Sequence, residues 1–216
     1  PSTQALIASL AGADMMDEEG NVVGSSSNHV QLDQVSYAGI LDANEATFGK
    51  RVIPTYDFSK AKSIVSVGAD FLSGWLDAMQ YSNGYTSGRN PEGEWMSKHF
   101  QFEANMSLTG TNADLRVPVK PSEYAAVVAT MYNEVASKMG GSSVKVGSIN
   151  KDGAAHAKAA AAHLIENKGS ALVVCGSNDK NVQIVVNGLN EMLGSYGATI
   201  STDKVSNSKR GSDEAV

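Results

Sequence analysis

The stretch that decides the fold is Ala61-Lys62-Ser63-Ile64-Val65-Ser66-Val67-Gly68-Ala69-Asp70. Its centre is a nearly continuous apolar run rich in β-branched residues, which is typical of a parallel strand buried on both faces. Gly68 follows directly and is a turn residue. A second run of the same kind, Ala171 to Cys175, also ends at a glycine, Gly176. The two runs predict strands of a parallel sheet, each followed by a glycine turn.

Helical patterns alternate with these strands. Ser122 is expected to cap a strong helix from Glu123 to Met139, which ends at Gly140-Gly141. The other expected elements are strands at His99–Glu103 and Val117–Val119, helices at Val30–Asn44, Ala154–Asn167 and Val182–Leu193, and an amphipathic segment over 71–88 that breaks at Asn83-Gly84. Strands that alternate with helices of ten or more residues predict an α/β fold, here a parallel-sheet, Rossmann-like domain with helices on both faces.

The length of 216 residues is enough for one large domain or two small ones. We expect an α/β region over residues 1–200, for which a division into two lobes, about 20–145 and 146–200, stays open. Residues 201–216 are polar and are expected to form a tail or linker. The chain begins with Pro1 rather than Met, and we expect it to be a processed piece of a longer protein.

Charge and hydropathy argue against nucleic-acid binding and against a direct membrane span. The formal net charge is −6, and no basic cluster is larger than Lys209-Arg210, which argues against a nucleic-acid-binding surface. No apolar run approaches the roughly 20 residues that span a bilayer, so no direct membrane span is expected. The single cysteine, Cys175, cannot form a disulfide within the chain or supply the four or so thiolates of an iron–sulfur cluster. We expect it to be a buried small residue at a strand end rather than a reactive thiol.

In open parallel sheets, ligands bind beyond the carboxyl ends of the strands, where glycine lets the backbone approach a ligand and helix amides bind anions. Three turns of this kind supply the candidate cofactor-binding residues, which are Gly24, Ser25, Ser26, Gly68, Asp70, Gly176 and Ser177. Residues 24–31 also resemble residues 176–183 at a constant offset. Either any two strand–turn–helix units look this similar, or the two turns face one crevice. No metal ligands and no catalytic residues are assigned.

Four aromatic residues surround a glycine-rich stretch that follows the first strand. Two interpretations stay open for this group. It forms an aromatic docking surface for a partner, or it packs a long loop onto the core. The residues concerned are Trp75, Tyr81, Tyr85 and Trp95.

Several blocks, taken in order, resemble the molybdopterin oxidoreductase family. Residues 61–70 look like the family's strand that ends near an amide residue, Ala113-Asp114 with residues 117–121 looks like a second block, and residues 189–194 look like a later one. A finer resemblance is to the iron–sulfur subunit of alternative complex III, a quinol-oxidising respiratory complex. The blocks that carry it are residues 56–60, 68–72 with Trp75, 96–99, 102–103 and 106–110.

The resemblance implies a respiratory electron-transfer subunit on the periplasmic side of a bacterial inner membrane. It also implies association with the other subunits of a membrane-bound complex, and an iron–sulfur domain elsewhere in the same full-length chain. The fold it implies is that of the middle domains of molybdopterin oxidoreductases.

The sequence departs from the family's cofactor-binding pattern in two places. Asp70 stands where the family has an amide, and a carboxylate only accepts hydrogen bonds, so it repels the phosphates of a pterin dinucleotide. Pro121-Ser122-Glu123-Tyr124 stands where the family has Pro-Gly-Thr-Asp, and Tyr124 is placed to fill the space of a stacked ring. We therefore expect a vestigial pocket, no cofactor in this fragment and no catalysis by it alone. An alternative is that this chain is the cofactor-binding part of an active oxidoreductase and binds molybdopterin guanine dinucleotide. A third interpretation is that the chain is a stand-alone nucleotide-binding domain.

Overall fold

The computed structural model describes residues 6–7, 14–16, 22–25, 31–206 and 209–213. Its centre is an all-parallel sheet with the strand order β6-β5-β4-β7. The four strands are β4 (Ser63–Val67), β5 (Lys98–Glu103), β6 (Leu115–Pro118) and β7 (Ala171–Cys175). β4 is a central strand whose five residues are all buried, as its sequence predicts.

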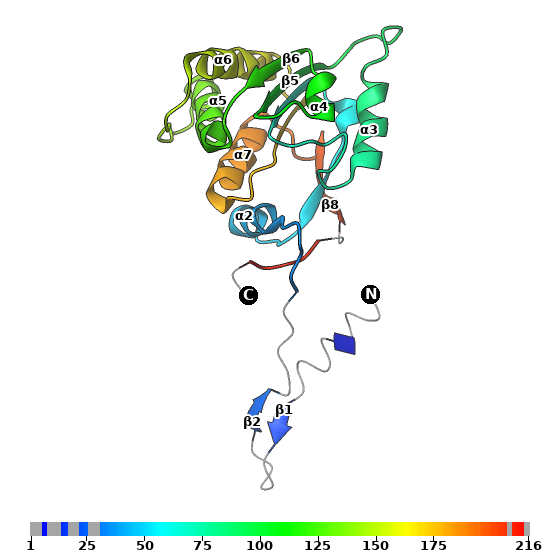
Figure 1. The fold of residues 1–216 in the computed structure, drawn as a ribbon, viewed down its shortest axis with the longest axis vertical. Coiled ribbons are helices and arrows are strands. Elements are labelled where there is room, and N and C mark those ends of the chain that lie inside the picture. The colour runs from blue at the N-terminus through cyan, green and yellow to red at the C-terminus, as the bar shows by residue number, and fades with distance from the viewer. Residues whose placement is uncertain (1–5, 8–13, 17–21, 26–30, 207–208, 214–216) are drawn as a thin grey trace.

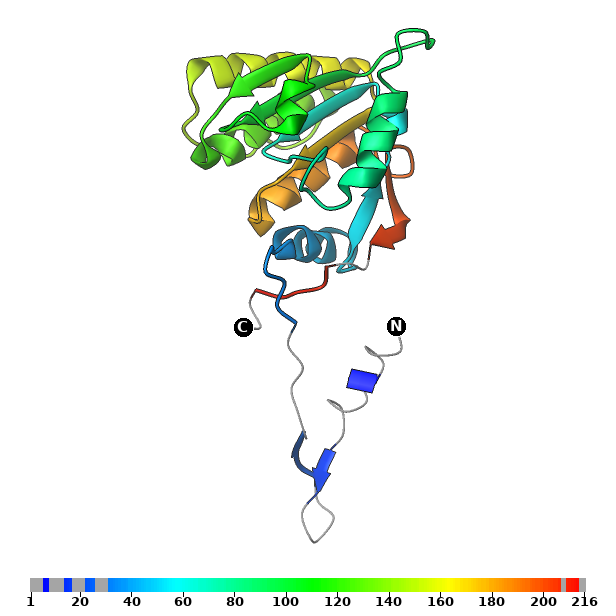
Figure 2. The same cartoon turned by 45° about the vertical axis from the view of Figure 1, so that its right-hand side comes forward.

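Helices cover both faces of this sheet (Figures 1 and 2). One face packs against α5 (Tyr124–Met139), α6 (Lys151–Glu166) and α7 (Lys180–Met192), and the apolar core there includes Val65 and Phe102. The other face carries α3 (Ala78–Ser87) and a second apolar cluster around Phe71. The predicted Rossmann-like α/β class is therefore confirmed.

The alternative of two lobes, left open for residues 20–145 and 146–200, is not what the structure shows, because one core joins the two parts. β7 pairs directly with β4, and residues from both parts share the cluster between the sheet and α5, α6 and α7. The expected tail after residue 200 is also wrong in part. β8 (Ile200–Ser206) pairs antiparallel with β3 (Ile53–Tyr56), so this stretch belongs to the folded structure.

Most expected helices and strands occur, with shifted ends. α2 (Ala38–Phe48) begins later than the helix expected at Val30–Asn44. Asn83-Gly84 does not break the chain but lies inside α3, where Gly84 sits close to the backbone of Ser59 in the 3-10 turn η1 (Phe58–Lys60). Ser122 caps no helix; it lies in a second 3-10 turn, η2 (Pro121–Glu123), which leads directly into α5.

The outer edge of β7 is closed by side chains rather than by another strand. The amide of Asn190 on α7 accepts a hydrogen bond from Val173 N at 3.0 Å and donates one to Val173 O at 2.8 Å. The hydroxyls of Ser195 and Thr199 both donate to Ala171 O, at 2.9 and 2.7 Å. Because an open edge invites pairing with another chain, these side chains protect the sheet as well as hold α7 against it.

Candidate functional site

The candidate site lies where the order of the strands reverses. The chain passes from β4 to β5 on one side, whereas β7 joins β4 on the other, so the carboxyl ends of β4 and β7 mark the topological switch point. The structure brings the predicted Gly68 and Gly176 turns together there. Gly176 N donates to Val67 O at 2.9 Å, and a Cβ on Gly176 would overlap the carbonyl oxygen of Gly68. Close packing of the two turns therefore requires glycine at position 176.

The third predicted turn is not part of this edge. Gly24 and Ser25 lie in β2 (Val22–Ser25), which pairs antiparallel with β1 (Asp14–Met16) in a separate two-stranded sheet. Figures 1 and 2 both draw this hairpin apart from the parallel sheet. The prediction that residues 24–26 follow a strand of the parallel sheet is wrong for the described part, because β2 joins β1 instead. Ser26 lies outside the described residues.

Tyr124 occupies the space beside the Gly68 turn. Gly68 has a φ of 67°, a left-handed conformation that favours glycine, and a Cβ there would overlap the ring of Tyr124. The Tyr124 hydroxyl accepts a hydrogen bond from Ala104 N at 3.3 Å, which fixes the ring from the opposite end. The side chain that the sequence singles out as a filler thus packs directly against the turn after β4.

Asp70 is engaged by the protein itself. Its Oδ1 accepts hydrogen bonds from the backbone N and the hydroxyl of Thr109, at 3.1 and 2.7 Å. Thr109 belongs to the short helix α4 (Leu108–Thr111), and its hydroxyl also accepts from Leu72 N at 3.0 Å. The Asp70 carbonyl in turn accepts from the backbone N of three residues of the following turn, 73–75. Asp70 therefore ties the loop after β4 to α4.

The turn after β7 is closed in a similar way. The Gln183 amide donates to Cys175 O at 2.9 Å and to Ser177 O at 2.6 Å. Asp179 caps α7, accepting from Asn181 N at 2.7 Å and Val182 N at 3.4 Å. The amides that could bind an anion at this helix start are thus satisfied by a carboxylate of the chain.

Cys175 is buried as the sequence predicts. It is 1% exposed, and burial raises the pKa of its thiol to about 12, so the thiol stays protonated at neutral pH. Trp75, Tyr81 and Tyr85 are buried as well, within the aromatic cluster that covers β4. Packing of the loop, rather than a docking surface, is therefore the role of these three rings.

Sequence reasoning missed a chain of buried polar groups on β5. His99, Gln101 and Glu103 point to one face of this strand and are at most 4% exposed. The His99 Nε2 lies 3.3 Å from Gln101 Oε1, and Gln101 Nε2 donates to Glu103 Oε2 at 3.1 Å. The alternation of polar residues was the available signal, but alternation usually indicates a solvated face.

Both ends of this polar chain have partners. Burial works to raise the pKa of Glu103, but hydrogen bonds from Ser107 and Arg116, the latter with Nε 2.6 Å from Oε1, lower it overall. At the other end, burial lowers the pKa of His99 to about 4, and its Nδ1 lies 3.2 Å from the Tyr85 hydroxyl. His99 is fully buried, and these contacts cross-link β5 to α3, to the start of α4 and to β6.

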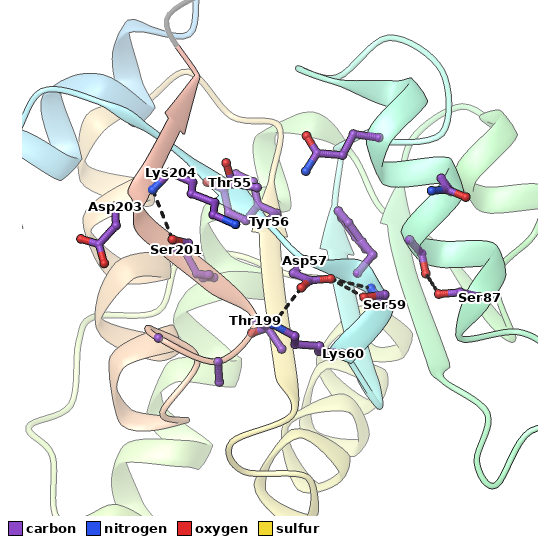
Figure 3. A pocket seen from close by; sticks show the side chains of 17 residues that line it. Thr55, Tyr56, Asp57, Ser59, Lys60, Ser87, Thr199, Ser201, Asp203 and Lys204 are labelled. Atoms are coloured by element: carbon purple, nitrogen blue, oxygen red, sulfur yellow. Dashed lines mark hydrogen bonds and ion pairs between the residues drawn. The ribbon is translucent and has the colours of Figure 1, made fainter.

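A cavity of about 510 Å³ lies elsewhere, between α3, η1 and the β3–β8 pair (Figure 3). Asp57 and Lys60 form an ion pair at 3.1 Å on one wall, and Asp57 N donates to Thr199 O at 2.7 Å. In Figure 3 the side chain of Lys204 extends toward Thr55 and Tyr56, whereas Asp203 points away. The lining is polar, and it includes none of the described candidate residues.

A scan against models of known protein families finds no match to this chain, and a search of curated proteins finds none either. Within the described residues, no helix is both long and apolar enough to cross a membrane. In the same part of the chain, no three His, Cys, Asp or Glu side chains gather in a way that could hold a metal ion.

Proposed function

We propose that this chain is a scaffold region of a respiratory electron-transfer subunit that resembles the molybdopterin oxidoreductases, and that its cofactor pocket is vestigial. In this proposal the full-length protein also carries an iron–sulfur domain. It binds other subunits of a membrane-bound complex on the periplasmic side of a bacterial inner membrane. The region contributes no chemistry of its own and serves to position its neighbours.

The observation that carries the proposal is the ring of Tyr124 against Gly68 at the switch point. A dinucleotide needs the backbone of this turn to be open, since phosphates approach glycine amides directly. Here the ring of Tyr124 fills the space beside Gly68, and the Asp70 carboxylate accepts a hydrogen bond from the Thr109 hydroxyl. An amide side chain at position 70 could instead donate a hydrogen bond to a ligand. These contacts support loss of the pocket within a fold that otherwise keeps the arrangement of strand ends.

A scaffold role also fits the way the interior is tied together. Arg116 and Glu103 pair across β6 and β5, and Arg89 pairs with Asp114 at 2.6 Å at the other end of the same strands. The buried chain His99–Gln101–Glu103 has a hydrogen-bond partner for each side chain, and a satisfied network of this kind makes a core rigid. A rigid region is what a subunit needs in order to hold redox groups of neighbouring domains at fixed separations.

The test is the molybdenum, iron and oxidised-pterin content of the full-length native protein. Iron without molybdenum or pterin is the expected result. Near-stoichiometric molybdenum and pterin would overturn the proposal and make this region one wall of a working oxidoreductase site. A thermal-shift screen with adenine and guanine nucleotides addresses the third reading, since a ligand that binds only the folded state raises Tm.

A further inference from the structure

Residues 209–213, here called the strap, lie alongside α2 at the end of the described chain (Figures 1 and 2). They belong to no helix or strand, yet their backbone is extensively hydrogen bonded. The N–H groups of Arg210 and Gly211 both donate to Asp33 Oδ2, at 3.0 and 2.7 Å, and Ser212 N donates to Gln31 O at 3.2 Å. Three consecutive amides are therefore held by residues 31–33.

Arg51 holds the carbonyl groups of the same segment. Its Nη1 donates to Arg210 O at 3.0 Å and its Nη2 donates to Gly211 O at 2.7 Å, while its Nε pairs with Asp42 at 2.8 Å. A planar guanidinium can bind two acceptors and a carboxylate at once, which the point charge of a lysine cannot do. Asp33 and Arg51 thus recognise the strap by its main chain.

Gly211 is required where the strap meets Asp33. A Cβ at this position would lie 2.9 Å from both the N and the Oδ2 of Asp33, which is closer than real Cβ contacts. A side chain at position 211 would not fit beside Asp33, so the site selects glycine there.

The strap ends on the turn after β7. Asp213 Oδ2 accepts hydrogen bonds from Ser36 Oγ at 2.8 Å and from Asn178 Nδ2 at 2.9 Å. The other atom of the Asn178 amide, Oδ1, accepts from Gly39 N at 2.9 Å in α2. Asn178 directly follows Ser177, so the strap, α2 and the switch-point edge meet at one side chain.

We propose that Asp33, Ser36, Arg51 and Asn178 form a latch for the strap, a self-recognition site specific for an extended segment with a central glycine followed, two residues later, by the side-chain carboxylate of Asp213. When the latch is closed, the strap holds α2 against the turn after β7. When it opens, residues 36–39 and 176–180 lose that support while the parallel sheet stays folded. The inference rests on these contacts alone and is independent of whether the neighbouring pocket is vestigial.

Trypsin reports directly on the latch, because the strap contains its cleavage sites after Lys209 and Arg210. Proteolysis requires a segment to leave the folded structure. The experiment compares cleavage at these two bonds in the full chain with cleavage in a free peptide of residues 205–216. Arg51→Lys keeps the charge but can keep at most one of the two hydrogen bonds to the strap carbonyls, and we expect it to speed cleavage by roughly tenfold, since one hydrogen bond to a charged group is worth about that factor. Gly211→Ala, measured against its own free peptide, should act in the same direction.

Ser212→Ala is the matched control, because Ser212 contributes its backbone N–H to the latch, and its cleavage rate should stay that of the unaltered chain. Amide hydrogen exchange on the same variants reports the second part of the proposal. Arg51→Lys should raise exchange at residues 36–39 and 176–180 and leave β4 and β7 protected. The latch is refuted if trypsin cuts the unaltered strap as fast as the free peptide, or if it cuts the Arg51→Lys variant no faster than the unaltered chain. Release of the strap without faster exchange at 176–180 would refute its hold on that turn.

Discussion

Replacing Asn190 with alanine is the sharpest test of how the sheet is closed. The side chain is 1% exposed and makes both of its hydrogen bonds to one residue of β7, Val173. Alanine would leave the Val173 N–H and C=O buried without partners. No neighbouring side chain replaces them, because Ser195 and Thr199 are already committed to Ala171 O.

The magnitude follows from the two groups left unpaired. A buried donor or acceptor without a partner costs about 1–3 kcal/mol, so Asn190→Ala should lower the free energy of unfolding by about 3 kcal/mol. For a chain of this size, 1 kcal/mol corresponds to roughly 2–4 °C, and Tm should fall by roughly 6–12 °C. The exposed β7 edge should also increase self-association on heating.

Urea denaturation and calorimetry would measure the effect, with Glu191→Ala as the control. Glu191 is the next residue of α7 and is exposed, so its loss should change stability by less than about 0.5 kcal/mol. Asn190→Asp provides a second, chemically sharper comparison. An ionised carboxylate accepts from Val173 N but cannot donate to Val173 O, whereas the protonated acid can do both.

The pH dependence of Asn190→Asp has a defined sign. Burial beside a carbonyl raises the pKa of the introduced acid above its value in the unfolded chain. The variant is therefore destabilised at neutral pH and recovers relative to the unaltered protein as pH falls through the folded-state pKa. The reasoning is refuted if Asn190→Ala is no more damaging than Glu191→Ala, or if Asn190→Asp does not recover in acid.

Two further predictions concern the switch point and the polar chain on β5. Gly68→Ala should lower stability by at least about 2 kcal/mol in denaturant titrations, because it combines a left-handed backbone with overlap on the Tyr124 ring; adding Tyr124→Ala should relieve only the overlap. His99, with a pKa near 4 in the folded protein against about 6.5 unfolded, should stay neutral to about pH 5 in NMR titrations of its ring. Because the unfolded chain then binds more protons, His99 should remove up to about 3 kcal/mol of stability as pH falls from about 6.5 to 4. A ring that titrates near pH 6.5 would contradict this.

The sequence was sufficient for elements with strong local signals. Ile64 to Val67 could only be a buried strand, and the helix before Gly140 ends where a left-handed glycine, with φ of 82°, stops it. The pairing of β3 with β8 could not be predicted in this way. Apart from the buried Ile200, β8 is mostly polar and only partly buried, and its partner lies almost 150 positions earlier, so no local pattern indicates the contact.

The position of the candidate site could be predicted from the sequence, but whether side chains of the protein fill it could not. Glycine after a buried strand indicates where parallel strands end, and Gly68 and Gly176 do meet at one edge. Whether that edge is open depends on side-chain direction. Tyr124 is more than fifty residues from Gly68 in the chain, and Asp70 finds its partner only because α4 brings Thr109 to it.

The polar groups of β5 show why burial is the property hardest to predict from a pattern. His99, Gln101 and Glu103 alternate with Phe100 and Phe102, as in a strand with one wet face. What makes that face dry is the aromatic cluster of the loop after β4, whose Phe71 ring lies 5.3 Å from that of His99. Once water is excluded, each polar group needs a partner within the protein, and the partners come from α3 and β6. The same exclusion of water that lowers the pKa of His99 makes this chain of groups a fixed cross-link between β5 and its neighbours.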